Sequence, residues 1–368
     1  MADSGFRLLI AGGKTGGHLF PGIAVAEAVK NLDPHAAILF VGTGSRFEID
    51  ALEPYGFDHS AIVSSGIKGK GILEKLKALA SVPVSLVQAA WIIRGFRPDV
   101  VLGVGGYSSG PVVLTARLMG IKTALQEQNA IPGITNRILA HMVHTIFTAF
   151  EETSGFPVGG KVAWVGNPVR RVPVRTGIDL ESVREPGEFT VLITGGSQGA
   201  SSINRAVLEA ISMLDNPQGF RFIHQTGKMD EESVALAYEA LGLRARVKAF
   251  FQDMPRIQEQ ADLVICRAGA GTLSEITAKG KPSILIPFPY AADDHQRFNA
   301  MALVDQGAAV MILDRDLNGK ILKQTLETLK NDPERLAAMA ANAGRLSMPR
   351  AAETIASRCL DMGTCKGN

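Results

Sequence analysis

A strand, a glycine-rich loop and a helix occur in the same order at two places about half a chain apart. The first spans Leu8–Gly17 and continues into an amphipathic stretch, Phe20–Lys30. The second spans Val191–Ala200 and continues into a helical stretch, Ser201–Leu214. Continuous apolar strands between helices are typical of a parallel sheet covered on both faces. The repeat therefore predicts an α/β chain of two Rossmann-like domains in tandem.

Further apolar runs extend both predicted sheets. They are Ala37–Val41, Val100–Leu102, Thr123–Gln126, Thr145–Thr148, Phe220–His224, Leu263–Cys266 and Ser283–Ile286. A polar linker, rich in Gly and Pro, lies between Gly166 and Pro186. We expect one domain over residues 1–168 and a second over 169–348. Because Pro349 interrupts the helical pattern, we expect a last helix, 349–368, to pack back on the first domain.

Composition excludes several classes of protein. The 368 residues are 46% hydrophobic, which is enough apolar material for two cores and excludes a disordered chain. A formal net charge of +2, from 38 basic and 36 acidic residues, argues against a nucleic-acid partner. The scattered Cys266, Cys359 and Cys365 give neither a disulfide framework nor a zinc site, which fits a reducing cytoplasm. The segment Met1–Arg7 has no apolar core of a signal peptide. The longest apolar stretch, Ala78–Ile93, is shorter than the ~20 residues that span a membrane. We therefore expect a soluble protein or one attached to a membrane surface.

Glycine loops between a strand and a helix suit phosphate binding, since the backbone approaches closely and the helix offers N–H groups. A single loop is weak support, because glycine also serves tight turns. Two matched loops, together with Gly103–Gly110, are stronger support. Gly13-Lys14-Thr15 is not the end of a P-loop, which would have glycine in place of Leu8. Neither opening has the Gly-x-Gly-x-x-Gly pattern, which argues against a dehydrogenase.

A cluster of small residues, Arg267–Glu275, follows the predicted strand that ends at Cys266. Small residues let a ligand approach closely, and we expect a helix to begin near Thr272. Glu275 can accept two hydrogen bonds from a ribose diol, as an acidic residue does in dinucleotide folds. It can equally be a capping acid favoured by the helix dipole. Spacing alone leaves both interpretations open.

Two polar segments follow this cluster. Asp293–Asn299 carries amide and imidazole groups that suit sugar hydroxyls, and it could equally be a solvated helix start. Asp314-Arg315-Asp316 has the Asp-x-Asp spacing of some metal-dependent sugar transferases. Because it precedes Asn318-Gly319 in a polar turn, we expect a solvated acidic loop instead.

Seven motifs in a fixed order resemble the MurG family of bacterial N-acetylglucosaminyltransferases. They are Gly12–His18 with Pro21-Gly22, Gly103–Tyr107, Glu127–Asn129, Gly166–Arg170, Gly195–Gly199, Arg267–Glu275 and His295-Gln296. The resemblance covers nearly the whole chain. It implies a GT-B fold, in which two Rossmann-like domains face a deep cleft, with the donor held mainly by the C-terminal domain.

The resemblance also implies the reaction. N-acetylglucosamine would move, with inversion, from UDP-N-acetylglucosamine to the 4-hydroxyl of N-acetylmuramate in undecaprenyl-linked lipid I. The product would be lipid II for peptidoglycan synthesis. Two alternatives stay open from the residues alone: another GT-B enzyme, such as a non-hydrolysing UDP-N-acetylglucosamine 2-epimerase, or an inactive UDP-sugar sensor.

The resemblance implies donor contacts for individual residues. By group they are Phe251, whose backbone would meet uracil; Ala270, Gly271, Thr272, Leu273, Ser274 and Glu275 around the nucleoside, with Glu275 on the ribose; Ser197 and Arg170 at the diphosphate; and Gln296 and Asn129 at the sugar. Thr15, Gly16 and Gly17 would close over the donor from the N-terminal domain. Two positions depart from the family: Lys14 replaces a glycine of many members and leaves the loop conformation open, and Gly271 replaces a larger residue of some members.

His18 is the candidate general base, because an ordinary histidine pKa of ~6.5 suits proton transfer near neutrality. It could instead only cap the helix or bond to the loop, and Glu127 is the competing base or the partner of His18. The leaving diphosphate would meet the helix amides after Gly199 and the guanidinium of Arg170, which can replace a metal. We therefore expect no metal and no cofactor.

The lipid acceptor implies an enzyme on the cytoplasmic face of the cell membrane. A basic and apolar surface would reach the anionic inner leaflet. Its residues are Gly66–Leu73 with Lys75, Leu76, Lys77 and Leu79, extended by Trp91, Ile92, Ile93, Arg94, Phe96 and Arg97. The alternative is an ordinary helix with a solvated lysine face. Stem-peptide requirements, oligomeric state and contacts with other cell-wall synthesis proteins are left open by the sequence.

Overall fold

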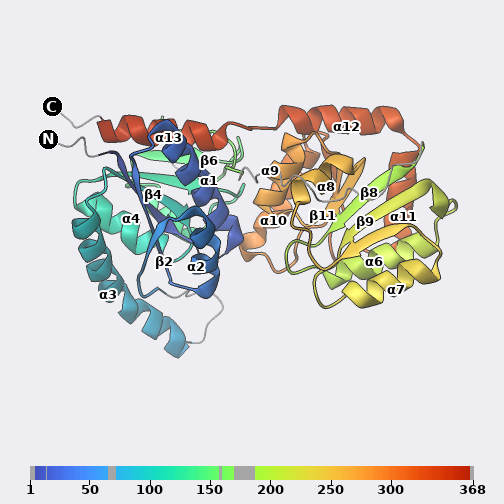
Figure 1. The fold of residues 1–368 in the computed structure, drawn as a ribbon, viewed down its shortest axis with the longest axis horizontal. Coiled ribbons are helices and arrows are strands. Elements are labelled where there is room, and N and C mark those ends of the chain that lie inside the picture. Colours follow the sequence, from blue (N-terminus) through green and yellow to red (C-terminus); the bar gives the residue numbers. More distant parts are fainter. Residues whose placement is uncertain (1–4, 14, 65–71, 157–159, 170–186, 365–368) are drawn as a thin grey trace. The chain divides into compact units, whose positions relative to one another are not determined.

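Each half of the chain is built on a sheet of its own. The computed structural model describes residues 5–13, 15–64, 72–156, 160–169 and 187–364, with the backbone alone for 72–80. The chain divides into two units, which are described separately below (Figure 1). The first unit comprises Met1–Arg170 and Met348–Asn368, and the second comprises Arg171–Ser347.

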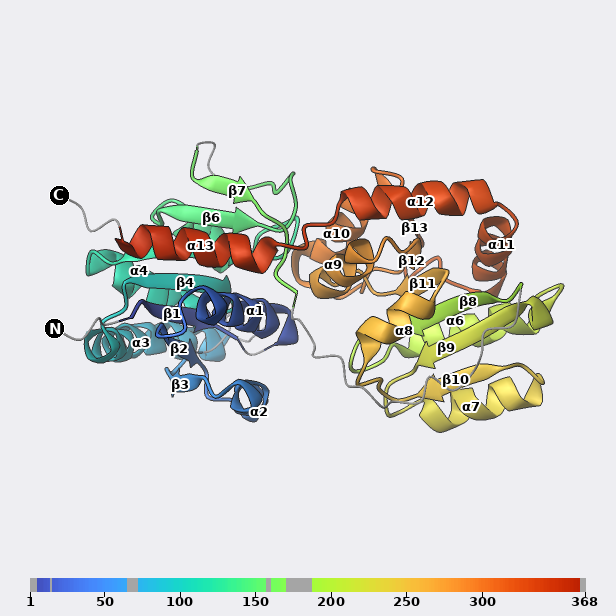
Figure 2. The same cartoon turned by 45° about the horizontal axis from the view of Figure 1, so that its top comes forward.

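Apolar runs form the centre of a parallel sheet in the first unit. Among the described residues this sheet has seven strands in the order β3-β2-β1-β4-β5-β6-β7 (Figure 2). In chain order they are β1 (Arg7–Gly12), β2 (Ala37–Gly42), β3 (Asp58–Ala61), β4 (Val100–Gly105), β5 (Lys122–Glu127), β6 (Thr145–Thr148) and β7 (Val162–Trp164). The strand order reverses between β1 and β4, and ligands of nucleotide-binding folds lie beyond the strand ends at such a point.

Helices cover both faces of this sheet, because alternate strand residues point to opposite sides. Leu8 and Ile10 of β1 pack in one core with helices α1 and α13, whereas Leu9 packs in another with α3 and α4. The helix bounds are α1 (Gly16–Leu32), α2 (Arg46–Leu52), α3 (Ile72–Phe96), α4 (Ser109–Leu118), α5 (Ile134–Leu139) and α13 (Ala351–Thr364). Helix α13 comes from the end of the chain and packs along α1 (Figure 1).

The second unit repeats the topology of the first. In the part of this unit that the structure describes, six parallel strands lie in the order β10-β9-β8-β11-β12-β13. They are β8 (Phe189–Thr194), β9 (Phe220–Gln225), β10 (Ala245–Lys248), β11 (Leu263–Cys266), β12 (Ser283–Leu285) and β13 (Ala309–Met311). The order reverses between β8 and β11, as it does between β1 and β4. The two glycine-loop openings therefore occupy equivalent places.

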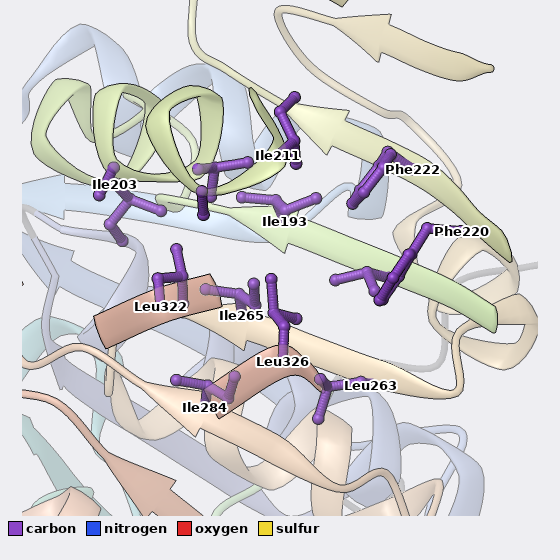
Figure 3. Close-up of a cluster of buried hydrophobic side chains, with 14 of the residues drawn as sticks. Ile193, Ile203, Ile211, Phe220, Phe222, Leu263, Ile265, Ile284, Leu322 and Leu326 are labelled. Carbon is purple, nitrogen blue, oxygen red and sulfur yellow. The ribbon is translucent and has the colours of Figure 1, made fainter. Parts of the chain in front are cut away.

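Ile193 of β8 and Ile265 of β11 lie at the centre of a hydrophobic core in the second unit (Figure 3). Ile203 of helix α6 and Leu322 of helix α11 pack against the same face of the sheet. The helix bounds are α6 (Ser201–Ser212), α7 (Glu231–Ala240), α8 (Met254–Gln260), α9 (Ala270–Ala278), α10 (His295–Val304), α11 (Gly319–Lys330) and α12 (Pro333–Arg345). This packing fixes the start of α6, where the glycine loop ends.

The predicted α/β class, with two Rossmann-like parallel sheets, is confirmed. The sequence-based prediction lacks β3, β7, β10 and β13, which are the edge strands of the two sheets. An edge strand pairs on one side only, and such strands are short and partly exposed, so they carry no long apolar run. Helix α1 begins at Gly16 rather than at the expected Phe20, because Thr15 takes the N-cap position.

Candidate functional site

The first glycine loop ends in a turn that orients His18. Thr15 is the N-cap of α1, and its carbonyl accepts a hydrogen bond from the His18 backbone N–H at 3.1 Å. The hydroxyl oxygen of Thr15 lies 2.9 Å from Nδ1 of the His18 ring. The two residues are therefore joined through both backbone and side chains, and the imidazole is held at the mouth of the loop.

The ring of His18 lies against the backbone of Gly105, where β4 ends. A Cβ atom on Gly105 would stand 2.6 Å from Cδ2 of His18 and 3.0 Å from Nε2. Gly105 also has a φ of +95°, which side-chain-bearing residues rarely adopt. A Cβ on Gly12 would in turn collide with the carbonyl oxygen of Gly105. Gly12 and Gly105, one from each of two predicted glycine loops, thus meet at the switch point of the first sheet.

Glu127, at the end of β5, is the centre of a separate hydrogen-bonded loop. Its buried carboxylate accepts hydrogen bonds from Nδ2 of Asn136 at 2.8 Å, the backbone N–H of Asn129 at 3.0 Å, Nδ2 of Asn129 at 3.2 Å and the N–H of Gly133 at 3.3 Å. Burial raises the pKa of Glu127, and these hydrogen bonds partly oppose that rise. In this geometry Glu127 fixes the position of Asn129, while the ring of His18 contacts Thr15.

The glycine loop of the second unit is tied to the segment around Phe251. The side chain of Gln225 donates to the carbonyl of Gly196 at 3.0 Å and accepts from the backbone N–H of Phe251 at 2.9 Å. A side chain on Gly199, whose φ is +78°, would collide with the carbonyl of Thr226. The N–H of Phe251 is therefore already bonded within the protein. The uracil predicted at this segment would have to contact other groups of the segment.

A cavity of about 500 Å³ lies beside the same glycine loop, at the carboxyl ends of β8 and β11. It is lined by Gly195, Gly196, Gly199, Ala200, Ser201, Ser202, Arg267, Gly269, Thr272, Phe288, Pro289, Tyr290, Gln296 and Asp314. The start of α6 supplies backbone N–H groups at one side, and Gln296 supplies an amide. The predicted Thr272 and Gln296 are thus brought together, whereas Ser197 is an exposed residue of the loop, outside this lining set.

Helix α9 carries the predicted nucleoside residues in different environments. Ala270 and Leu273 are buried, and the backbone N–H and carbonyl of Leu273 are bonded to Gly269 and Thr277 within the protein. The hydroxyl of Ser274 donates to the carbonyl of Ala270 at 2.9 Å, and Gly271 has open space where a side chain would stand. The helix begins at Ala270, slightly before the expected Thr272.

Glu275 lies in the second turn of α9, beyond the first turn, which holds no acidic residue. The capping interpretation is therefore wrong for this helix. One oxygen of the Glu275 carboxylate accepts a hydrogen bond from the side chain of Gln258, on α8, at 3.0 Å. Gln258 is buried, so this contact fixes the direction of the carboxylate.

Gln296, in the first turn of α10, follows two strained residues. Asp293 and Asp294 have φ values of 55° and 53°, which non-glycine residues adopt at a cost. The side-chain oxygen of Gln296 accepts a hydrogen bond from the backbone N–H of Phe288 at 3.0 Å. This bond points the oxygen toward the protein, so the amide nitrogen is the group it can offer to a ligand in the cavity.

The sequence-based interpretation of Asp314 as part of a solvated loop is wrong. Its carboxylate lies 2.6 Å from Nη1 of Arg267 and accepts a hydrogen bond from the hydroxyl of Ser202 at 2.9 Å. Its neighbours Arg315 and Asp316 are exposed, as expected. One signal could have found Asp314: it follows a β-strand at the carboxyl end of the sheet, where the other site residues also lie.

Some predicted residues fall outside the described part of the chain. They are Lys14, Gly66–Gly71 and Arg170, together with the side chains of Ile72, Leu73, Lys75, Leu76, Lys77 and Leu79. Among the residues that are described, no three His, Cys, Asp or Glu side chains form a group that could hold a metal ion.

Two family descriptions match most of the chain. The glycosyltransferase family 28 N-terminal domain matches residues 8–148, and the glycosyltransferase family 28 C-terminal domain matches residues 190–355. A protein of Myxococcus xanthus (strain DK1622) is 48% identical over 97% of this chain and 93% of its own length. A protein of Syntrophus aciditrophicus (strain SB) is also 48% identical, over 97% of this chain and 98% of its own length. Both are named UDP-N-acetylglucosamine--N-acetylmuramyl-(pentapeptide) pyrophosphoryl-undecaprenol N-acetylglucosamine transferase.

Comparison with solved structures also finds similar proteins. The crystal structure of Acinetobacter baumannii MurG is similar with a TM-score of 0.80 and 28% identity, covering 97% of this chain and 99% of that one. A UDP-GlcNAc 2-epimerase from Neisseria meningitidis, bound to UDP-GlcNAc, has a TM-score of 0.66, with coverage of 96% and 99%. At 13% identity the epimerase supports the fold alone.

Proposed function

The chain belongs to glycosyltransferase family 28, and we infer that it transfers N-acetylglucosamine from UDP-N-acetylglucosamine to the N-acetylmuramyl unit of undecaprenyl-linked lipid I. It is a UDP-N-acetylglucosamine-dependent N-acetylglucosaminyltransferase, and its product is lipid II for peptidoglycan synthesis. The observation that carries this conclusion is the 48% identity, along 97% of the chain, to relatives that bear the name of this activity.

The epimerase alternative has weaker support. Structures named as UDP-N-acetylglucosamine 2-epimerases share the fold at 11–13% identity, which is too distant to carry an activity. The sensor alternative would require loss of the catalytic groups, whereas His18, Asn129 and Gln296 are all present. The transferase is therefore the function that both the site and the relatives favour.

The donor binds in the second unit, with its diphosphate at the start of α6 beside Ser197. Backbone N–H groups at a helix N-terminus suit an anion, and the 500 Å³ cavity beginning there has room for a sugar. The amide nitrogen of Gln296 meets the sugar, Phe251 marks the uracil segment, and the carboxylate of Glu275 meets the ribose. Gln258 supports that last assignment, because it holds the Glu275 carboxylate in one direction.

The first unit holds the acceptor and carries the base. The 4-hydroxyl of N-acetylmuramate attacks the anomeric carbon of the donor, the bond from that carbon to UDP breaks, and the hydroxyl proton passes to Nε2 of His18. Thr15 supports this role: when Nδ1 of His18 donates its hydrogen to the Thr15 hydroxyl, Nε2 carries the lone pair that a base needs. Contact of Thr15, Gly16, Gly17 and Asn129 with the donor remains a prediction.

Departing UDP gains negative charge on its diphosphate. Backbone N–H groups of Ser197, Gln198 and the first turn of α6 stabilise that charge, together with the guanidinium of Arg170. The N–H groups of Gly196 and Gly199 are bonded within the protein instead. Preorganised donors of this kind are typically worth about 3 kcal/mol each in a transition state. The mechanism therefore needs no metal ion, and turnover with a soluble acceptor analogue is expected to continue in excess chelator.

A membrane surface would supply the lipid acceptor. Within the described residues no helix is both long and apolar enough to span a membrane. Val84, Val87 and Trp91 are exposed along one face of α3, and this apolar strip supports peripheral attachment to the inner leaflet. Three residues expected in the patch pack inward instead: Ile93 is buried, and Ile92 and Phe96 pack against the same core. The centre of the Phe96 ring also lies 4.5 Å from the guanidinium carbon of Arg7.

The test is a transfer assay with labelled UDP-N-acetylglucosamine, with and without a lipid I analogue. A transferase forms labelled lipid II and releases UDP only when the acceptor is present. Conversion of the donor to its 2-epimer without acceptor would support the epimerase instead. Binding of the donor with no product under either condition would support the sensor.

A further inference from the structure

Arg267 and Asp314 form an ion pair inside the donor cavity. Nη1 of Arg267 lies 2.6 Å from the Asp314 carboxylate, and both side chains are mostly buried, at 13% and 20% exposure. Nη2 of Arg267 donates to the hydroxyl of Ser202 at 2.9 Å, and that hydroxyl donates in turn to Asp314 at 2.9 Å. The three side chains therefore form a closed ring of hydrogen bonds.

This ring joins three separate segments that line the cavity. Ser202 is the second residue of α6, Arg267 follows β11, and Asp314 follows β13. Arg267 also donates to the carbonyls of Ile286 at 3.2 Å and Pro287 at 3.1 Å, on the segment that leads to α10. The position of the guanidinium is thus set by groups of the protein itself.

The charge of Arg267 lies next to the place proposed for the diphosphate. Ser202 belongs to the first turn of α6, whose backbone N–H groups are the proposed anion site. An arginine without a carboxylate partner at this position would bind a diphosphate strongly, before and after transfer. Tight binding of the product UDP does not help turnover, since only interactions stronger in the transition state accelerate the reaction. Asp314 cancels most of that charge.

We propose that Asp314 is a positioning residue that holds Arg267 against the wall of the donor cavity and cancels its charge beside the diphosphate. The guanidinium then shapes the cavity, while the loop and helix amides hold the phosphates. This inference rests on the proposed function, because it assumes that the diphosphate of a UDP-sugar lies at the start of α6.

The experiment compares UDP with uridine, which lacks phosphate, as ligands of the wild type and of Asp314→Asn. Isothermal titration calorimetry is run at low and high salt. Asp314→Asn should bind UDP roughly five- to tenfold more tightly than the wild type, because a full positive charge now faces the diphosphate. Uridine should bind equally well to both proteins. The gain for UDP should shrink at high salt, and kcat and KM for the donor should both fall because UDP leaves slowly.

Three further variants provide matched comparisons. Asp316→Asn, two residues away and exposed, should bind UDP like the wild type. Arg267→Gln leaves the carboxylate without its partner, so UDP binding should weaken roughly five- to tenfold while uridine binding stays the same. The double variant Arg267→Gln/Asp314→Asn carries neither charge and should return UDP affinity to near the wild-type value.

The outcomes separate this inference from the proposed function. If Asp314→Asn binds UDP no more tightly than the wild type, or if uridine and UDP change in parallel, Asp314 has only a structural role and the inference is wrong. The opposite change expected for Arg267→Gln is an independent check, which remains available if Asp314→Asn does not fold. Wild-type protein that binds neither uridine nor UDP would overturn the proposed function itself.

Discussion

Nδ1 of His18 lies 2.9 Å from the hydroxyl oxygen of Thr15, which is the N-cap residue of the same helix. The cap side chain makes no hydrogen bond to the backbone N–H groups of α1. Its hydroxyl instead bonds to the imidazole of His18. The N-cap residue therefore orients the proposed base rather than capping the helix through its side chain. Thr15 thus orients the proposed base, as a third group orients the catalytic histidine in other enzymes.

Replacing Thr15 with Val should lower kcat about tenfold, because the ring loses the partner that fixes its orientation and tautomer. His18→Ala should lower kcat by about 10²- to 10⁴-fold, the usual range for a general base. Both are measured with labelled donor and a soluble acceptor analogue. His35→Ala, at an exposed histidine of the same unit, is the control and should keep full activity. Full activity of His18→Ala would leave His18 with only a capping role.

Gly105→Ala should damage both stability and activity. A φ of +95° costs a residue with a side chain about 1–3 kcal/mol, and the new Cβ would also stand 2.6 Å from the His18 ring. Gly120→Ala is the matched control, since Gly120 has a φ of +79° and no neighbouring atom within 4 Å of a Cβ. Thermal unfolding should show a loss in both variants, while transfer activity should fall only in Gly105→Ala. Equal activity in the two variants would contradict the contact with His18.

The sequence predicts the topology well, because topology follows from local patterns. A strand buried on both faces is apolar along most of its length, as in Leu8–Ala11 and Val191–Ile193, and the loop after it shows glycine where the backbone turns. Since parallel strands end at the same edge, placing these strands also places the loops that follow them. The fold and the general location of the site can therefore be predicted before any contact is known.

Side-chain partners are harder to predict, because they depend on residues distant in the chain. Judged by its sequence neighbours Asp314 looks solvated, and only two partners distant in the chain, Arg267 and Ser202, change that interpretation. Glu127 has the right chemistry to support His18, yet its hydrogen bonds go to Asn129, Gly133 and Asn136. The sequence identifies which residues gather at the site, but not which of them contact one another.

Glu275→Gln should weaken recognition of the ribose. The amide keeps the size of the side chain but loses the charge that strengthens hydrogen bonds to a diol, so the KM for donor should rise about tenfold or more. Binding of UDP should also approach that of 2′-deoxy-UDP, as judged by competition. Glu259→Gln on α8 is the control, because the Glu259 side chain is exposed and pairs only with Lys279 among its described ion pairs. An unchanged preference for UDP over its deoxy analogue in Glu275→Gln would rule out the ribose contact.

His224 makes the stability of the second unit depend on pH. It is fully buried, and burial lowers its pKa to about 3, although the nearby Asp230 opposes this shift. Nδ2 of Asn204 donates to Asp230 at 2.8 Å, so the amide oxygen of Asn204 is the acceptor, at 3.0 Å, for Nε2–H of a neutral His224. The hydroxyl of Tyr238 then donates to Nδ1, at 3.3 Å.

Because the unfolded chain binds a proton below pH 6.5 and the folded protein does not until about pH 3, the stability contribution is full above pH 6.5 and is lost as the pH falls. Between pH 7 and pH 5 this single group should remove about 2 kcal/mol from the free energy of unfolding. Urea titrations at several pH values measure it. His224→Gln should flatten this slope although it is less stable at pH 7, and His141→Gln, at an exposed histidine, should keep it. A slope that persists in His224→Gln would assign the effect to other groups.

Charge placed on the exposed face of α3 should detach the protein from membranes without harming the reaction. Trp91 is 76% exposed and shares a helix face with Val87, so Val87→Asp/Trp91→Glu opposes both apolar insertion and the anionic surface. Co-sedimentation with vesicles that contain anionic lipid should fall several-fold, whereas transfer to a soluble acceptor should stay near the wild-type rate. Met229→Glu changes a side chain that is 90% exposed in the second unit and should bind vesicles normally. Equal vesicle binding by the α3 variant and the wild type would move the membrane contact away from this face, and loss of soluble activity would mean that the face serves the reaction itself.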